Sequence, residues 1–546
     1  MAEYHEITVL PEGKKIMAEA GKTLMDALAE HVDLRADCGG NGVCGKCRII
    51  VITKGLPDLN DVEQEHLSSG LITSGYRLAC QVVVDRPMMV RLPESGQDKG
   101  HVEAKKVFPG PYPVNPYLEL KADKRYLGLA VDLGTTTVAG YLCDLKTGHI
   151  LASRATINPQ RRYGDDVISR INFAGKSPAN LKRLQGLALD AISYLADTCL
   201  KEVNGDRDDI YGLIVAGNTT MEHILAGLDV SRLGRTPFTP ATFSEIKFKT
   251  EELGLRFRPG TSFTILPIIA AFVGGDTLAC VLANKPYRRD EMTLIVDLGT
   301  NGEIVLGNKE GMWTTSCATG PALEGAQLSC GMRATLGAIS ACDIDPATYK
   351  FSYKTIGEDI EPPLGFCGSG ILDLIAAMIK SGIVKSGGNF NKNAPGYTIS
   401  DRDGGMARVV FIPEDNNPAK VEIFVSQHDI RQVQLAKAAV ITGIRELMNK
   451  VGIKKIDRTI LTGAFGNAFN WRSAVTIGML PDLDTLGKVV STDNLAGEGA
   501  VLALLDKNTR FEAEEIKSKT QYMNLAEQSG FMQKFVENTG FDEAKE

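Results

Sequence analysis

A short motif occurs twice in this chain and constrains its fold more than any other feature. Residues 131–138 read VDLGTTTV, and residues 296–303 read VDLGTNGE. Each copy follows an apolar stretch that predicts a strand (residues 126–130 and 292–295), and each leads into a second predicted strand and a turn. Self-similarity of this kind indicates two related domains. Strands and helices alternate in both halves, with long helices expected at 180–203 and 430–450, so each half is predicted to be α/β.

The repeated motif also predicts a chemistry. Gly and Thr in a tight turn between two strands present N–H and hydroxyl donors, which suit phosphate oxygens. Asp132 and Asp297, at the strand ends, can bind Mg²⁺ through water. Two such turns facing one another would hold the phosphates of ATP from both sides. The predicted phosphate contacts are Gly134, Thr135, Thr136 and Thr137 in the first copy, and Gly299, Thr300, Asn301 and Gly302 in the second.

A further loop, at residues 462–466, follows the strand predicted at 456–460, and residues 213–220 occupy the corresponding place in the first half. Its glycines would let the backbone lie against an adenosine. The predicted contacts are Gly463, Ala464, Phe465 and Gly466.

Three carboxylates are the candidate catalytic groups: Asp132, Asp297 and Glu303. Glu303 is predicted to position water, and the alternative is an ordinary strand residue that faces solvent. Asp276, in a Gly-Gly-Asp sequence, is a further candidate for a metal or water contact.

Four cysteines near the N-terminus predict a metal centre. Their spacing is C-x5-C-x2-C-x32-C, and three of them lie in a glycine-rich loop. Four thiolates at such spacing suit a 2Fe-2S cluster, although plant-type ferredoxins have one residue fewer in the first gap. A structural zinc site is the rival, but zinc sites usually contain two CxxC-type pairs and this chain has one. The predicted cluster ligands are Cys38, Cys44, Cys47 and Cys80.

Residues 1–95 around these cysteines predict a β-grasp ferredoxin domain of α+β class. Strands are expected at 6–10, 14–19, 47–52 and 88–92, and short helices at 23–31, where Thr23 is the expected N-cap, and at 61–67. Residues 96–124 contain a proline-rich stretch that can neither pair in a sheet nor continue a helix. This stretch predicts a semi-rigid linker, with packing on a protein surface as the alternative. The two ATPase subdomains are expected at 125–288 and at 289–546, the latter with a charged helical extension.

Composition excludes some classes of function. The net charge of -7 argues against a nucleic-acid-binding protein, which would carry a basic face. No stretch approaches the roughly 20 apolar residues of a membrane span, and the acidic N-terminus lacks a signal-peptide pattern. A cytoplasmic location is therefore expected.

Taken together, the two motifs and the third loop resemble the actin, sugar kinase and Hsp70-like ATPase superfamily. With the cysteine domain in front, the whole chain resembles the reductive activators of corrinoid proteins. Residues 320–326 (GPALEGA), 330–334 (CGMRA), 158–160 (NPQ) and 163–167 (YGDDV) carry this resemblance further.

The resemblance implies a function and partners. Such activators use a 2Fe-2S cluster, ATP and Mg²⁺ to reduce the cobalt of a corrinoid methyl-carrier protein by one electron, from Co(II) to Co(I). A low-potential ferredoxin or flavoprotein would supply the electron, and a homodimer is possible. The alternatives are an activator of a radical dehydratase, a redox-sensing ATP-binding module, and a small-molecule kinase of the same fold.

Overall fold

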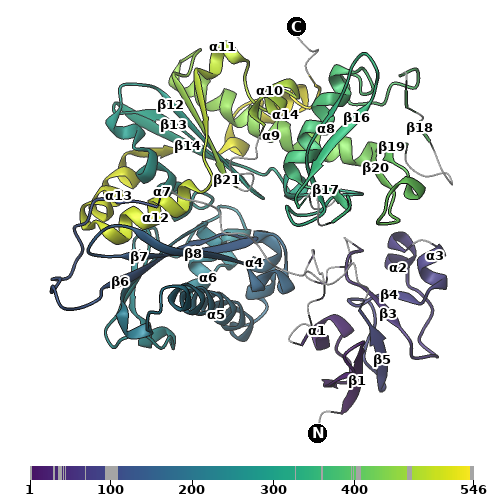
Figure 1. The fold of residues 1–546 in the computed structure, drawn as a ribbon, viewed down its shortest axis with the longest axis horizontal. Helices are drawn as coiled ribbons and strands as arrows, with labels where there is room; N and C mark the ends of the chain where they lie inside the picture. The colour runs from purple at the N-terminus through teal and green to yellow at the C-terminus, as the bar shows by residue number, and fades with distance from the viewer. Residues whose placement is uncertain are drawn as a thin grey trace.

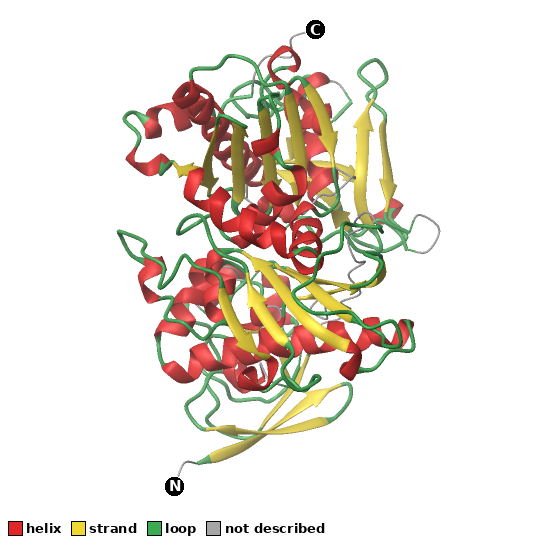
Figure 2. Ribbon diagram, turned by 90° about the vertical axis from the view of Figure 1, so that its left-hand side faces the viewer, coloured by secondary structure: helices red, strands yellow, loops and turns green. Residues whose placement is uncertain are grey.

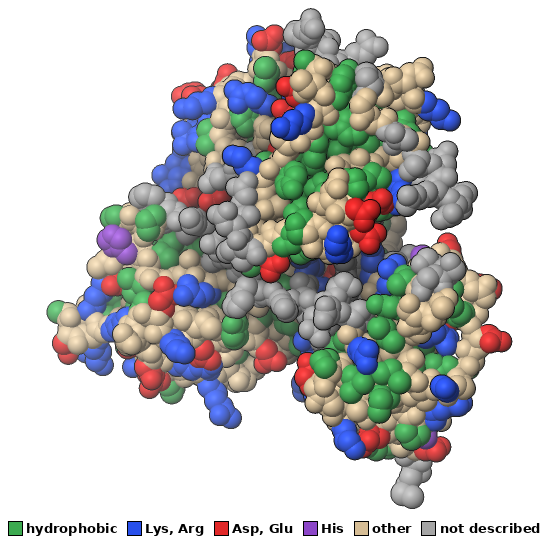
Figure 3. Space-filling model, turned by 45° about the vertical axis from the view of Figure 1, so that its right-hand side comes forward, with side chains coloured by type: hydrophobic (Ala, Val, Ile, Leu, Met, Phe, Trp, Pro, Cys, Tyr) green, Lys and Arg blue, Asp and Glu red, His purple; other side chains and the backbone are tan. Residues whose placement is uncertain are grey.

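The computed structural model describes residues 3–28, 31–32, 34, 38, 40, 42, 45–67, 69–92, 109–325, 328–357, 361–394, 396–397, 399–400, 407–463 and 470–541. It contains a small N-terminal domain and two larger lobes (Figure 1). Figure 3 shows the N-terminal domain as a separate rounded body beside the two lobes.

The N-terminal domain is one five-stranded sheet covered by short helices. The strand order is β2-β1-β5-β3-β4, with β1 and β5 parallel, as expected of a β-grasp ferredoxin. Alternate residues of these strands, such as Ile7, Val9 and Val90, are fully buried. They belong to an apolar core whose members all come from residues 7–92 of the chain. The elements are β1 (Tyr4–Leu10), β2 (Lys14–Glu19), α1 (Leu24–Leu28), β3 (Arg48–Val51), α2 (Asp61–His66), α3 (Ser69–Thr73), β4 (Tyr76–Leu78) and β5 (Met88–Arg91).

The predicted N-cap of α1 is confirmed, because the Thr23 hydroxyl accepts a hydrogen bond from the Asp26 N–H at 3.1 Å. The sequence analysis did not predict β4 or α3.

Lobe I is a six-stranded sheet in the order β10-β11-β9-β6-β7-β8, flanked by helices. Its apolar core lies between the sheet and α5, whose buried positions recur at helical spacing. The elements are β6 (Leu127–Leu133), β7 (Thr137–Asp144), β8 (Ile150–Ile157), α4 (Val167–Gly175), α5 (Pro178–Glu202), β9 (Ile210–Gly217), α6 (Thr219–Leu225), β10 (Ile246–Lys249), β11 (Ser262–Ile265) and α7 (Gly275–Asn284).

Lobe II repeats this plan with the order β22-β21-β12-β13-β14-β23 and adds two small sheets, β16-β15-β17 and β18-β19-β20. The bounds of the first part are β12 (Thr293–Leu298), β13 (Gly302–Asn308), β14 (Gly311–Cys317), β15 (Ala338–Ile344), β16 (Phe351–Thr355), β17 (Gly365–Phe366), α8 (Gly368–Lys380), β18 (Ile399–Ser400), β19 (Arg408–Ile412) and β20 (Ile423–Ser426). The second part comprises α9 (Gln427–Val451), β21 (Arg458–Gly463), α10 (Trp471–Thr476), α11 (Leu483–Leu486), β22 (Lys488–Ser491), α12 (Leu495–Leu505), α13 (Lys507–Lys519), β23 (Thr520–Tyr522) and α14 (Phe531–Glu537).

The pairing registers of the two lobes match strand for strand. In lobe I, β6 pairs with β7 antiparallel and with β9 parallel, so that Leu133 lies beside Gly217. In lobe II, β12 pairs with β13 antiparallel and with β21 parallel, so that Leu298 lies beside Gly463. The repeated motif therefore marks two copies of one sheet, and the α/β ATPase fold expected from the sequence is confirmed.

Two helices pack between the two large sheets (Figure 2). Both α7 and α12 contact strands of each lobe, and they pack tightly against one another. The sequence places α12 near the C-terminus, yet its residues Ala500 and Val501 are buried with Ala130 and Tyr141 of lobe I. The chain thus returns to lobe I before it ends in lobe II.

Part of the predicted linker is bound to lobe I. The Tyr112 N–H donates to the Gly148 carbonyl at 2.9 Å, and the Ile150 N–H donates to the Pro109 carbonyl at 2.8 Å. Asn115 exchanges backbone hydrogen bonds with Leu505 and Lys507 at the end of α12. Residues 109–115 therefore lie on the protein surface, and residues 93–108 lie outside the described ranges.

Candidate functional site: cysteine centre and phosphate loops

The cysteines of the N-terminal domain supply the first candidate site. The Cys47 and Cys80 sulfurs are 3.3 Å apart, and both side chains are buried. Cys38 is also buried, while Cys44 lies outside the described residues. As placed, no three described His, Cys, Asp or Glu side chains converge on one metal position. The fit to a cluster therefore depends on the paired sulfurs and on their donors.

Hydrogen bonds favour the thiolate form of Cys80. Its bond with Cys47 and a 3.2 Å bond from the Gln81 side-chain amide lower the pKa of Cys80 to about 7, against the opposing effects of burial and of Cys38. Metal ligation requires the thiolate, so this position is suited to a cluster.

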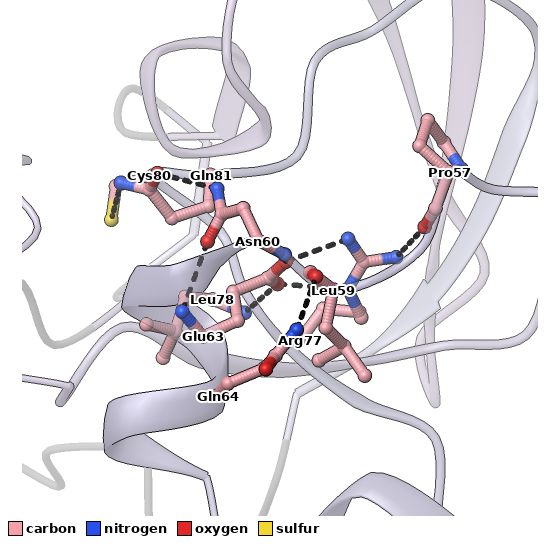
Figure 4. A network of polar contacts seen from close by, with 9 residues as sticks. All are labelled: Pro57, Leu59, Asn60, Glu63, Gln64, Arg77, Leu78, Cys80 and Gln81. Atoms are coloured by element: carbon pink, nitrogen blue, oxygen red, sulfur yellow. Dashed lines mark hydrogen bonds and ion pairs between the residues drawn. The ribbon is translucent and has the colours of Figure 1, made fainter.

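A polar network holds the Gln81 side chain that donates to the Cys80 sulfur (Figure 4). The Gln81 side-chain oxygen accepts a 2.9 Å hydrogen bond from Asn60, which caps α2 and whose side chain accepts from the Glu63 N–H. Glu63 is fully buried, and both of its oxygens accept hydrogen bonds from Arg77, at 2.8 and 2.7 Å. The network thus links Cys80 to α2 and β4 through groups whose geometry is fixed on both sides.

The first predicted phosphate loop is the β6–β7 turn, and side chains of lobe I hold it in place through hydrogen bonds. Asn158 donates to the Gly134 carbonyl at 2.9 Å, and Asn218, the N-cap of α6, donates to the Thr135 hydroxyl at 2.8 Å. The fully buried guanidinium of Arg170 donates to the Thr135 carbonyl at 2.5 Å. Burial lowers the pKa of Arg170 to about 10, which leaves it charged at neutral pH.

The second predicted phosphate loop is the β12–β13 turn. The Gly299 N–H donates to the Asn301 carbonyl at 2.9 Å, which closes the turn. The Thr319 hydroxyl lies 3.0 Å from the Gly299 carbonyl and 2.8 Å from the Thr300 carbonyl. The loop is thereby fixed to the segment that follows β14.

The two phosphate loops come close to one another where the lobes meet. One carboxylate, that of Glu324, accepts hydrogen bonds from the Thr136 hydroxyl at 2.8 Å and from the Thr300 hydroxyl at 2.5 Å. Hydroxyls from both loops therefore reach a single anion, which is the geometry that binding a phosphate chain from two sides requires.

Carboxylates gather beside these loops. Burial and the charges of Asp297 and Asp132 raise the pKa of Asp276 to about 7, against hydrogen bonds from Thr277. Burial, followed by the charges of Asp276 and Asp297, raises the pKa of Glu303 well above its usual value. The side chain of Asn494, the N-cap of α12, donates to Asp132 at 2.8 Å. Such mutual repulsion between carboxylates is relieved when a divalent cation binds among them.

Glu303 does not face solvent, which was the alternative to a functional role. It is only 8% exposed and accepts a 3.3 Å hydrogen bond from the Ser316 hydroxyl. Asp297 lies in β12 directly opposite Glu303 in β13.

The predicted adenosine loop begins at the end of β21. Gly463 has a φ of +104°, and a Cβ there would overlap Oδ1 of Asp297, so the backbone of this loop lies directly against the second phosphate loop. Ala464, Phe465 and Gly466 lie outside the described residues.

Sequence reasoning gave no role to five residues that hold this site: Asn158, Arg170, Asn218, Glu324 and Asn494. Asn158 and Glu324 lie within motifs that carried only the resemblance. Asn218 follows a predicted strand at a position that corresponds to the adenosine loop, so its place in the repeat could have indicated it. Nothing local marks Arg170 or Asn494, because their contacts are distant in sequence.

Comparisons with known proteins agree with this architecture. Residues 7–85 match the family described as 2Fe-2S iron-sulfur cluster binding domain, residues 127–289 match the RACo middle region, and residues 291–546 match the C-terminal domain of RACo, the ASKHA domain.

The corrinoid activation enzyme RamQ of Eubacterium limosum is 37% identical over 427 residues, which cover 77% of this chain and 71% of RamQ. The Co(II) methylated amine-specific corrinoid protein reductase of Methanosarcina barkeri is 24% identical over 309 residues, 50% of this chain and 56% of that protein. The solved structure of a reductive activator for corrinoid, iron-sulfur protein has a TM-score of 0.71 and 29% identity, and the match covers 98% of both chains.

Fold and site together define a class, in which a 2Fe-2S ferredoxin domain is joined to a two-lobed ATPase of the actin, sugar kinase and Hsp70-like type. Within that class, the chain belongs to the RACo family of reductive activators of corrinoid proteins. No helix in the described ranges is both long and apolar enough to cross a membrane.

Proposed function

We propose that this protein transfers one electron to the cobalt of a corrinoid methyl-carrier protein, which reduces it from Co(II) to Co(I), and that ATP drives this reaction. The observation that carries the proposal is the presence, in one chain, of paired cysteine sulfurs in a ferredoxin domain and of two phosphate loops whose hydroxyls reach a single carboxylate. A low-potential ferredoxin or flavoprotein is the proposed electron donor, and a homodimer remains a prediction.

In the ferredoxin domain, Cys38, Cys44, Cys47 and Cys80 would hold the cluster. The cluster, when bound, supplies a one-electron carrier with a potential that reaches roughly −400 mV in plant-type ferredoxins. The chain's own contribution is to favour the thiolate of Cys80 through hydrogen bonds from Cys47 and Gln81. Such donors tune the potential of a cluster.

Between the lobes, Thr135, Thr136 and Thr137 of one loop and Thr300, Asn301 and Gly302 of the other would bind the phosphates of ATP. Asp132 and Asp297 would hold Mg²⁺ through water, with Asp276 close by, and Glu303 would orient the attacking water. The backbone at 463–466 would lie against the adenosine. Each loop is anchored within its own lobe, so phosphates held by both would draw the lobes together.

Closure of the lobes offers a way to drive an unfavourable electron transfer. A one-electron potential gap of about 59 mV corresponds to a tenfold change in population. ATP can shift such an equilibrium only if the closed form binds the two states of the corrinoid partner differently. The proposal therefore requires that nucleotide binding change the affinity for the partner.

The test is anaerobic absorbance spectroscopy of a Co(II) corrinoid protein mixed with this protein and a low-potential reductant, with and without Mg-ATP. The Co(I) band is expected only with Mg-ATP. Cys47→Ser and Asp297→Asn should abolish it. The matched controls, Cys199→Ser in the buried face of α5 and Asp290→Asn on the surface, should leave it unchanged.

Two results would contradict the proposal. If Co(I) forms equally well without ATP, the ATPase lobes do not drive the reaction. If the cluster is reduced but no corrinoid partner accepts the electron, an activator of a dehydratase or a redox-sensing ATP-binding module becomes the better interpretation.

A further inference from the structure

The carboxylate of Glu324 lies where the two phosphate loops meet. Its two oxygens accept hydrogen bonds from hydroxyls on opposite lobes, Thr136 at 2.8 Å and Thr300 at 2.5 Å. Thr136 follows β6 in lobe I, and Thr300 follows β12 in lobe II. This one side chain therefore links the two lobes through the hydroxyls expected to bind the phosphates of a nucleotide.

A carboxylate and a phosphate both accept hydrogen bonds from these hydroxyls. Each threonine hydroxyl has one proton to donate, and Glu324 uses both protons. Hydrogen bonds to an ionised acceptor are also stronger than neutral ones. A triphosphate that accepts hydrogen bonds from these two hydroxyls must break both of their bonds to Glu324. Its negative charge also repels the nearby Glu324 carboxylate.

The segment that carries Glu324 is fixed at both ends. Before it, Thr319 is bonded to the second phosphate loop. Beyond it, the Met332 N–H donates to the Phe366 carbonyl in β17 at 2.9 Å. Gly325 lies between, with a φ of +76°, and a Cβ there would overlap the Met332 carbonyl oxygen. Glu324 thus occupies a short turn, Pro321–Glu324, between the two phosphate loops and the small sheet that contains β17.

We propose that Glu324 is a latch that occupies the phosphate site of the nucleotide-free protein, and that the triphosphate of ATP displaces it. The inference rests on the proposed function, since it requires that ATP bind at these loops. It adds the way in which ATP binding is sensed: the released carboxylate frees the turn at 321–324 from the two loops, and β17 receives the change through Gly325, which packs closely against Met332, the residue hydrogen-bonded to Phe366.

The experiment measures the affinity for the non-hydrolysable analogue AMP-PNP with Mg²⁺ by isothermal titration calorimetry, in the full-length protein. Glu324→Ala and the isosteric Glu324→Gln remove the competing anion, and each is expected to tighten binding by about tenfold, an ordinary size for coupling between two groups. Glu310→Gln, an exposed glutamate in the β13–β14 turn, removes the same charge elsewhere and should leave the affinity unchanged.

A second readout follows the turn itself by hydrogen–deuterium exchange of peptides that cover residues 316–325. In the wild type, exchange should rise when AMP-PNP binds. In Glu324→Gln it should already be high without nucleotide. If Glu324 had a purely structural role, Glu324→Gln would lower the stability of the protein. The exchange rates of residues 316–325 in that variant would then not match those of the nucleotide-bound wild type.

The outcomes separate the two proposals. If the wild type binds AMP-PNP but the Glu324 variants bind it no more tightly, the latch is wrong and the proposed function stands. Weaker binding by the variants also overturns the latch, because Glu324 would then contact the bound nucleotide or its metal ion. If the wild type binds no nucleotide, the proposed function fails and the latch fails with it.

Discussion

At the scale of single residues, the buried pair of Glu63 and Arg77 should govern the stability of the ferredoxin domain. Glu63 is fully buried, and its partner is only 13% exposed. Glu63→Gln leaves the guanidinium without its counter-charge, which is expected to cost about 3 kcal/mol of unfolding free energy. Glu65→Gln, an exposed position on the same helix, is the control and should change little. Denaturant unfolding followed by circular dichroism measures both.

The same pair predicts a dependence on pH. Burial alone would raise the pKa of Glu63, but hydrogen bonds from Arg77, Leu78 and Asn60 outweigh it and hold the pKa below the usual 4.5. A lowered pKa stabilises the fold above the unfolded-state value, and this stabilisation is lost as the pH falls through the folded-state value. The difference between wild type and Glu63→Gln should therefore be constant between about pH 6 and 8 and shrink below about pH 4.5. A difference that grows in acid would contradict this assignment.

Gln81 is expected to tune the reduction potential. Its amide donates to the Cys80 sulfur, and a donor to a cluster sulfur stabilises the reduced, more negative state. Gln81→Leu should therefore lower the cluster potential by an amount on the order of tens of millivolts, measured by anaerobic potentiometric titration. Gln64→Leu removes a similar amide that donates instead to the Leu59 carbonyl, and its potential should match that of the wild type. An unchanged potential in Gln81→Leu would show that this bond is absent in the cluster-bound protein.

At the scale of elements, the close packing of α7 against α12 should limit what can be changed between the lobes. A Cβ at Gly499 in α12 would overlap the backbone of Ala279 in α7, whereas a Cβ at Gly186 in α5 would meet nothing within 4 Å. Gly499→Ala should destabilise the protein by about 1–3 kcal/mol through overpacking. Gly186→Ala should be neutral or stabilising by up to about 1 kcal/mol, because alanine is the better helix former. Thermal unfolding of the two variants compares them, and equal melting temperatures would count against tight packing at Gly499.

Elements with a strong local pattern were predictable from the sequence. The long helices expected at 180–203 and 430–450 are α5 and α9, and the strands before Asp132 and Asp297 are β6 and β12. Their apolar residues recur at fixed spacing, which a single segment reveals. The short strands β15 to β20 escaped prediction, because strands of two to seven residues depend on partners elsewhere in the chain for their stability.

The candidate site divides in the same way. Phosphate-loop residues were found because glycine and threonine must follow a strand directly, so sequence and geometry coincide there. Glu324 and Asn494 were given no role, because each has a partner in lobe I that lies more than a hundred positions away in sequence. The return of α12 to lobe I was missed for the same reason.

At the scale of the whole molecule, the ferredoxin domain has a core of its own, built from residues 7–92. The domain is joined to the ATPase lobes by the stretch of chain that precedes Pro109. If that stretch acts as a tether, its length sets how often the domain meets its electron acceptor. Inserting a Gly/Ser segment that doubles residues 93–108 should cost about 0.6 kcal/mol of loop-closure free energy, which slows ATP-dependent Co(I) formation about threefold.

Stopped-flow absorbance of the Co(I) band measures this rate, while ATP hydrolysis and cluster content serve as internal controls and should not change. A matched insertion in the exposed β13–β14 turn at Glu310 lengthens the chain equally without touching the tether. Complete loss of Co(I) formation in the tether variant would indicate that the ferredoxin domain works from one fixed position on the lobes. An unchanged rate would indicate that a step other than the domain encounter, such as lobe closure, limits electron transfer.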